Sequence, residues 1–169
     1  CVLSDKLDPL ISKIKQGLFN SYYVNTDESP INVNGKNHQI HSYSNEKYTL
    51  QYVHEKKSKS AIIELGFLPN YVGTLIHDHN TVQYNWGTKH GECNAHILRY
   101  LKAAKEFTKH KWSLEMADLL KEILHCKHSL LLENVSNFSK AKLDSYSQKY
   151  DDILKTASDE YLSDYETNA

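Results

Sequence analysis

The dipeptide Asn34-Gly35 is the feature that most restricts how this chain can fold. Asn and Gly tolerate the positive φ angles of a tight hairpin turn, so this pair between two β-rich runs is a strong hairpin signal. The run before it contains Tyr22-Tyr23-Val24 and Ile31-Asn32-Val33, and the run after it covers residues 36–43. The sequence therefore predicts two antiparallel strands joined at this turn.

A third strand is predicted directly after the hairpin. Ser44-Asn45-Glu46 forms a polar turn, and residues 48–53 then alternate in β-branched and aromatic side chains. Three consecutive strands joined by tight turns form an antiparallel meander.

A helical crossover and a fourth strand follow the meander. Residues 60–68 have the apolar spacing of a helix, with Ser60 as the expected N-cap and Gly66 at the end. A short apolar strand over residues 72–76 then ends at His77-Asp78-His79. Because a crossover returns the chain in the same direction, this strand should be parallel to one of the first three. If it pairs with the first strand, Asp27 and Asp78 become neighbours.

Helical spacing dominates both ends of the chain. A lead-in helix is predicted over residues 1–20, where Pro9 is tolerable only near the first turn. From Trp112 onward two apolar stripes predict a helical hairpin with its turn at residues 134–139. The predicted division is a lead-in helix (1–20), an α/β core (21–108) and a helical segment (109–169).

Charge and apolar content argue mildly against a nucleic-acid-binding protein and argue against a membrane protein. Lys and Arg number 20 against 21 Asp and Glu, so the formal charge of −1 provides no global basic field for nucleic acid. No apolar run approaches the roughly 20 residues that span a bilayer, so a membrane role is not expected. Three scattered Cys residues do not make a disulfide framework and are typical of a reducing cytoplasm, where we expect the protein to act.

Asp27 and Asp78 are the candidate catalytic residues. Each lies in or at the end of a predicted strand, where a carboxylate that converges with a second one can bind Mg²⁺ or Mn²⁺. A pair of such ions can activate a water or a 3′-hydroxyl for attack on a phosphodiester. The structural alternative is that Asp27 caps a turn and Asp78 caps the next helix, and periodicity alone slightly favours it.

Ordered blocks of the sequence resemble the insertion-sequence-66 family of DDE transposases. Any one block alone would be weak, but together, in order, they are specific and cover most of residues 20 to 125. The blocks are Thr26-Asp27-Glu28-Ser29 with Val33-Asn34-Gly35-Lys36, then residues 42–50, then residues 68–74 with Ile76-His77-Asp78-His79, and finally residues 93–101, which are similar to a C-x-A-H-x-x-R block.

The resemblance implies a fold, a reaction and partners. It implies an α/β, RNase H-like mixed sheet, in which an antiparallel three-strand meander is joined by a parallel strand, with an α-helical hairpin insertion. It implies Asp27 as the first catalytic acid and Asp78 as the second, both binding Mg²⁺ (or Mn²⁺). The implied reaction is cleavage of transposon ends and their transfer to target DNA, by a homo-oligomer assembled on DNA.

The third acid of the family has no match in this sequence. That acid is a Glu on a late helix near an N-x-x-E-R motif, whereas Glu160 and Glu166 lie in the predicted insertion and are not assigned to the role. Position 1 is Cys and the only Met is Met116. We therefore expect an internal fragment, incomplete at the C-terminus, whose third acid lies beyond residue 169 and which does not cleave DNA alone.

Other interpretations remain open. His90, Cys93 and His96, with His77 or His79, could bind zinc, but their spacing is not a strong zinc signature, and a structural role is favoured for Cys93 and His96. A complete RNase H-like metal nuclease would need a third carboxylate inside the chain. A non-catalytic helical interaction module would instead pair its apolar stripes with another chain.

Overall fold

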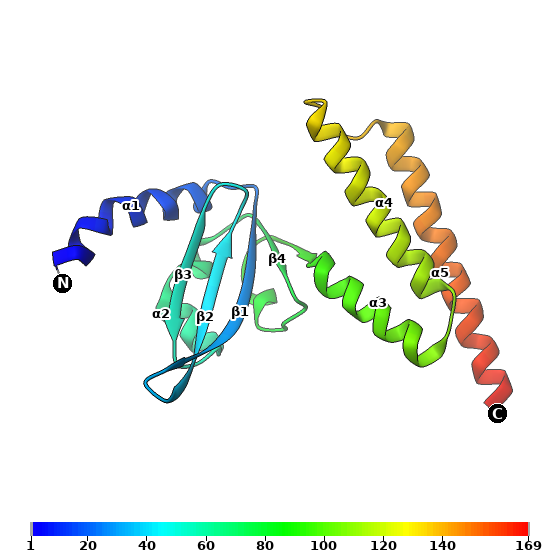
Figure 1. Ribbon diagram of the computed structural model, residues 1–169, viewed down its shortest axis with the longest axis horizontal. Coiled ribbons are helices and arrows are strands. Elements are labelled where there is room, and N and C mark those ends of the chain that lie inside the picture. The colour runs from blue at the N-terminus through cyan, green and yellow to red at the C-terminus, as the bar shows by residue number, and fades with distance from the viewer. Residues whose placement is uncertain (1, 169) are drawn as a thin grey trace. The chain divides into compact units, whose positions relative to one another are not determined.

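A computed structural model describes residues 2–168, with side chains described for residues 6–163. Cys1 and the side chain of Glu166 thus lie outside the described residues. The chain forms two compact units, which divide between Cys93 and Asn94. Its elements, in chain order, are α1 (Val2–Phe19), β1 (Tyr23–Val33), β2 (Lys36–Ser44), β3 (Thr49–His54), α2 (Lys59–Leu65), η1 (Leu68–Asn70), β4 (Thr74–His77), η2 (Gln83–Asn85), β5 (Lys89–Glu92), α3 (Asn94–Thr108), α4 (Trp112–Leu132) and α5 (Lys140–Asn168) (Figure 1).

The first unit is built on a mixed sheet of five strands in the order β3-β2-β1-β4-β5. The pairs β1–β2 and β2–β3 are antiparallel, which confirms the predicted meander. The pairs β1–β4 and β4–β5 are parallel, which confirms that the strand after the crossover lies beside the first strand. Strand β5 was not predicted, because Lys89–Glu92 is short and lacks the apolar alternation that identifies strands.

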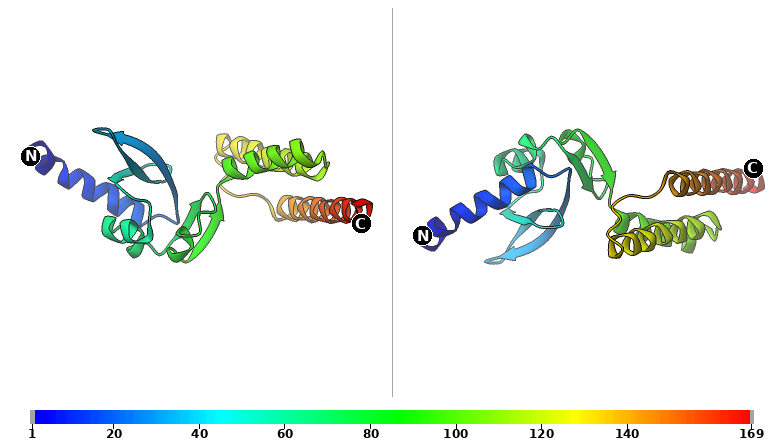
Figure 2. Two further views of the ribbon diagram at one scale, coloured as in Figure 1. Left: turned by 90° about the horizontal axis from the view of Figure 1, so that it is seen from below. Right: turned by 90° about the horizontal axis from the view of Figure 1, so that it is seen from above.

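The predicted hairpin turn is confirmed. Asn34 has a φ of 51° and Gly35 a φ of 80°, both in the left-handed region. The side chain of Asn32 supports the turn, because its Oδ1 accepts a hydrogen bond of 2.9 Å from the backbone N–H of Gly35. Only β1 and β2 pair near this turn, and the turn projects from the rest of the sheet (Figures 1 and 2).

Two predicted boundaries and the place of Pro9 in its helix differ from the structure. The cap of α2 is Ser58 and not Ser60, because Ser58 has the extended backbone of an N-cap and its Oγ accepts from the N–H of Ala61. Strand β4 covers Thr74–His77 rather than residues 72–76. Helix α1 begins at Val2, so Pro9 lies well past its first turn; the helix continues through a residue that cannot donate the usual backbone hydrogen bond.

The core of the first unit lies on one face of the sheet, which we call the core face. It carries Val24, Tyr43 and Leu75, and Leu18 of α1 and Ile62 of α2 pack against it. The alternation of strand side chains turns Asn25 and Asp27 to the opposite face, where both are exposed. We call this the open face, because the core cluster of the first unit draws no residue from it.

The second unit consists of helices. Helix α4 contacts both α3 and α5, around a core of Leu101, Met116, Leu119 and Tyr146. Helices α4 and α5 form the predicted hairpin (Figure 1). Residues 94–108, which the sequence division assigned to the α/β core, pack here with α4. Within the described residues, no helix is both long and apolar enough to span a membrane.

Glu160 has a structural position in the second unit. Its Oε1 accepts a 3.0 Å hydrogen bond from the N–H of Lys111, and its Oε2 accepts a 3.1 Å bond from the N–H of Trp112. These are orphan donors at the start of α4, where no residue supplies a local side-chain cap. The backbone donors lower the pKa of the Glu160 carboxyl. A residue of α5 therefore caps α4.

Candidate active site

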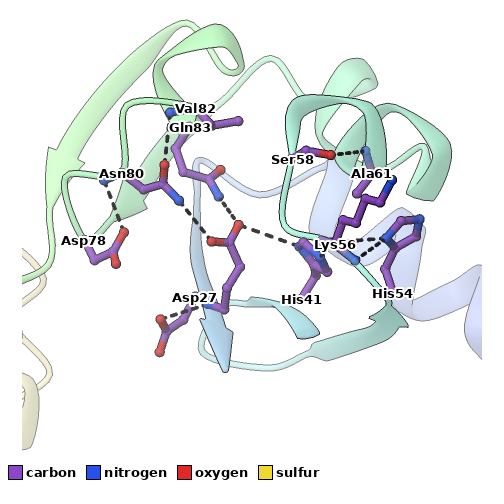
Figure 3. Close-up of polar contacts among 11 residues, drawn as sticks. Asp27, His41, His54, Lys56, Ser58, Ala61, Asp78, Asn80, Val82 and Gln83 are labelled. Atoms are coloured by element: carbon purple, nitrogen blue, oxygen red, sulfur yellow. Dashed lines mark hydrogen bonds and ion pairs between the residues drawn. The ribbon is translucent and has the colours of Figure 1, made fainter. Parts of the chain in front are cut away.

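Asp27 and Asp78 lie on adjacent parallel strands. Asp27 is in the middle of β1, and Asp78 directly follows the last residue of β4. The parallel register pairs Asn25 with Ile76, so two further residues along each strand bring Asp27 level with Asp78. Figure 3 shows both carboxyl groups on the side of β1 that faces away from His41 and His54. The topology thus brings together two residues that are 51 positions apart in the chain.

Backbone N–H groups orient both carboxylates. The N–H of Glu28 donates to Oδ1 of Asp27 at 2.9 Å, and the N–H of Asn80 donates to Oδ1 of Asp78 at 3.2 Å. Among the described residues, no recorded hydrogen bond engages Oδ2 of either carboxylate. Each acid therefore has one oxygen held by the protein and one oxygen open to another ligand.

The capping alternative describes these contacts only in part. Asp27 lies inside an eleven-residue strand and caps no turn. Asp78 accepts from the residue two positions ahead, which is the geometry of an Asx turn. It does not cap η2, which has no side-chain cap; Oδ1 of Asn80 accepts from the N–H of Val82, the residue before η2, at 3.1 Å.

The donor set of the two acids suits a hard divalent cation. Carboxylate oxygens are the ligands that Mg²⁺ prefers, and Mg²⁺ commonly uses one or two protein carboxylates and fills its other positions with waters and substrate phosphates. Two carboxylates are nevertheless a partial site. Among the described residues, no group of three or more His, Cys, Asp or Glu side chains is arranged to hold a metal ion. The described residues therefore also do not form the zinc site that was considered for His90 and Cys93.

Sequence reasoning missed a buried carboxylate beside this pair. The side chain of Glu28 is only 6% exposed, and it points to the core face, opposite to Asp27. Its Oε2 accepts from Nδ2 of Asn80 at 3.0 Å, and its Oε1 accepts from Nε2 of Gln83 at 2.7 Å. The alternation along β1 could have revealed it, because Glu28 is on the same face of the strand as the buried residues Val24 and Thr26.

His41 completes the surroundings of Glu28. Its Nε2 lies 3.0 Å from the carbonyl oxygen of Lys56, which can only accept, so Nε2 carries a proton. Its Nδ1 lies 3.6 Å from Oε1 of Glu28, too long for a hydrogen bond but within the range of an ion pair. Burial alone would lower the pKa of His41, but the contacts with Glu28 and the Lys56 carbonyl outweigh it and raise the pKa.

A second polar cluster lies at the ends of β4 and β5. Burial lowers the pKa of His77, whose Nε2 is 3.2 Å from Nδ1 of His90. Nδ1 of His79 lies 2.9 Å from Oε1 of Glu92, and the hydroxyl of Tyr84 donates to the same oxygen. The hydrogen bond from Tyr84 lowers the pKa of Glu92. His77 and His79, which flank Asp78, are thus both engaged by protein groups.

Comparison with known proteins identifies one family. A family model described as "Transposase IS66 family" matches residues 2–168, which is nearly the whole chain. No curated protein and no solved structure matches the chain.

Proposed function

We propose that Asp27 and Asp78 are two of the metal-binding acids of a DDE-type active site, because this chain belongs to the IS66 family of transposases. In this proposal the enzyme cleaves transposon DNA and joins it to a target. The observation that carries it is the placement of the two acids level with each other on the parallel strands β1 and β4. Family membership supports a role in transposition independently of this geometry.

We also propose that the sheet is RNase H-like. The support is its composition of an antiparallel three-strand meander, β1 to β3, followed by the parallel strands β4 and β5. In this arrangement Asp27 projects from the middle of β1, and Asp78 directly follows the end of the neighbouring parallel strand β4.

Asp27 and Asp78 would hold Mg²⁺ or Mn²⁺ through the oxygens that the protein leaves open. Bound in this way, the ions would activate the attacking hydroxyl or water and stabilise the leaving oxygen of a phosphodiester. The N–H groups of Glu28 and Asn80 fix each carboxylate through Oδ1, so neither side chain has to be ordered when the cation binds.

Glu160 is not proposed as the third acid. Both of its oxygens accept hydrogen bonds from the backbone N–H groups of residues 111 and 112. If Glu160 bound a metal ion instead, the start of α4 would lose its cap. DNA as the substrate and assembly into a homo-oligomer are proposed on the basis of the family.

Binding of Mn²⁺ to the 169-residue chain tests the assignment. Titration followed by electron paramagnetic resonance should detect binding that is strongly weakened in Asp27→Asn and in Asp78→Asn. Glu55→Gln is a suitable control, because Glu55 is an exposed acid on the same unit. Equal affinity in the wild type and in the Asp27→Asn/Asp78→Asn double variant would show that the two acids are not the metal ligands.

A further inference from the structure

Asp78 lies in a segment that neither a strand nor a helix supports. Residues 78–82 connect β4 to η2 through bends and turns. The backbone of His79, next to Asp78, has a φ of 67°, in the left-handed region that non-glycine residues rarely adopt. Such a conformation persists only when the surrounding structure holds it. The position of the Asp78 carboxylate therefore depends on contacts outside its own segment.

Asn80 connects this segment to the sheet. Its backbone N–H donates to Oδ1 of Asp78, its side-chain Oδ1 accepts from the N–H of Val82, and its Nδ2 donates to Oε2 of Glu28. One residue thus connects the second candidate acid, the start of η2 and strand β1. Figure 3 shows Asn80 between Asp78 and Val82.

Glu28 is the fixed end of this connection. It lies on β1 opposite His41 of β2, and its carboxylate accepts from Asn80 and Gln83 and faces the His41 ring. A buried carboxylate that lost these partners would be strongly destabilised, so the contacts oppose any displacement of residues 78–83. The N–H of Glu28 also holds Asp27, so this one residue contacts the first acid directly and the second through Asn80.

We propose that Glu28 is a positioning residue that sets the separation and orientation of Asp27 and Asp78 through its hydrogen bond with Asn80. It does so from the core face and is not itself a metal ligand. This inference rests on the proposed function, since it assigns Glu28 a role in the same site. Substitution of residues that orient metal ligands typically changes metal affinity about 10- to 100-fold.

A polarity exchange provides the test. Glu28→Gln leaves one acceptor oxygen for the two donors of Asn80 and Gln83, so its NH₂ group is set against one of them, while Asn80→Asp sets two carboxylates against each other. The double variant Glu28→Gln/Asn80→Asp restores one donor and one acceptor across the same contact. Oδ1 of an Asp at position 80 can still accept from Val82. We expect each single substitution to weaken Mn²⁺ binding about tenfold or more, and the double variant to recover most of the loss.

Hydrogen–deuterium exchange without metal separates positioning from the metal assignment. The amides of residues 78–82 should exchange faster in Glu28→Gln and return toward wild-type rates in the double variant. Unchanged exchange would overturn the inference, and so would faster exchange with unaltered Mn²⁺ affinity or a double variant no better than the single ones. If Asp27→Asn leaves Mn²⁺ binding intact, the proposed function fails as well, and the exchange rates then report only whether Glu28 orders the segment.

Discussion

The two units of this protein use carboxylates in different ways. In the sheet unit, Asp27 on β1 and Asp78 directly after β4 each have one oxygen that accepts no hydrogen bond from the described residues. In the helical unit, Glu160 caps a helix with both oxygens, and Glu122 pairs with Lys149 at 2.9 Å. Glu160 and Glu122 therefore stabilise the helical unit, whereas Asp27 and Asp78 are available to a ligand.

Packing explains the difference. Neighbouring strands are about 4.8 Å apart, so level side chains on two strands can share one ion, whereas packed helices are about 8–10 Å apart. The sheet also has a dense core on its opposite face, with Val24, Ile62 and Leu75 fully buried. In α5, by contrast, Tyr146 is the only buried residue among the described side chains, and Leu143 and Leu154 are 49% and 45% exposed. A site that needs fixed geometry is better supported by the sheet.

The largest expected effect is on the core of the sheet unit. Phe67 is 1% exposed and stacks on Phe19 and Tyr43 at centroid distances of 4.7 and 4.6 Å. We expect Phe67→Ala to lower the free energy of unfolding of the first unit by about 3–5 kcal/mol. Phe107→Ala is the matched control, because Phe107 is 88% exposed in α3.

The two tryptophans allow each unit to be followed separately. Trp86 packs against the core of the first unit and Trp112 against that of the second. Denaturant unfolding of Phe67→Ala, measured in single-tryptophan backgrounds, should shift only the Trp86 transition. An equal shift of both transitions would contradict the independence of the two units.

The next effect is a pH dependence confined to the sheet unit. The pKa of His41 is raised in the folded state, so its protonated form stabilises the fold below the unfolded value of about 6.5. This contribution is lost as the pH rises through the higher folded pKa. Unfolding between pH 5.5 and 9 should show the advantage of the wild type over His41→Gln shrinking as the pH rises. A constant difference across this range would exclude a charged His41–Glu28 pair.

The smallest expected effect is on the helical unit and has the opposite dependence on pH. The lowered pKa of Glu160 means that its stabilising effect is present above the unfolded value of about 4.3 and is lost as the pH falls through the folded pKa. Glu160→Gln should therefore lower the thermal stability of the second unit at pH 7 and have little effect at pH 3. Asp159→Asn, at an exposed neighbouring position, serves as the control. Equal loss at both pH values would contradict a cap that depends on charge.

The sequence by itself determined the features that depend on local chemistry. Asn34-Gly35 specified a hairpin because few residue pairs tolerate two positive φ angles. The order of meander, crossover and strand required β4 to run parallel to an earlier strand, and the alternation along β1 separated Asp27 from Glu28.

Tertiary structure alone decided the contacts between residues distant in the chain. Strand β5 exists because β4 offers it a free edge, and not because Lys89–Glu92 has strong strand propensity. Glu28 accepts from Asn80 and Gln83, which are 52 and 55 residues away, and Glu160 caps a helix that begins 48 residues earlier. A polar side chain can satisfy its hydrogen bonds with many partners, so only the assembled fold, in which burial makes an unsatisfied group costly, selects one of them.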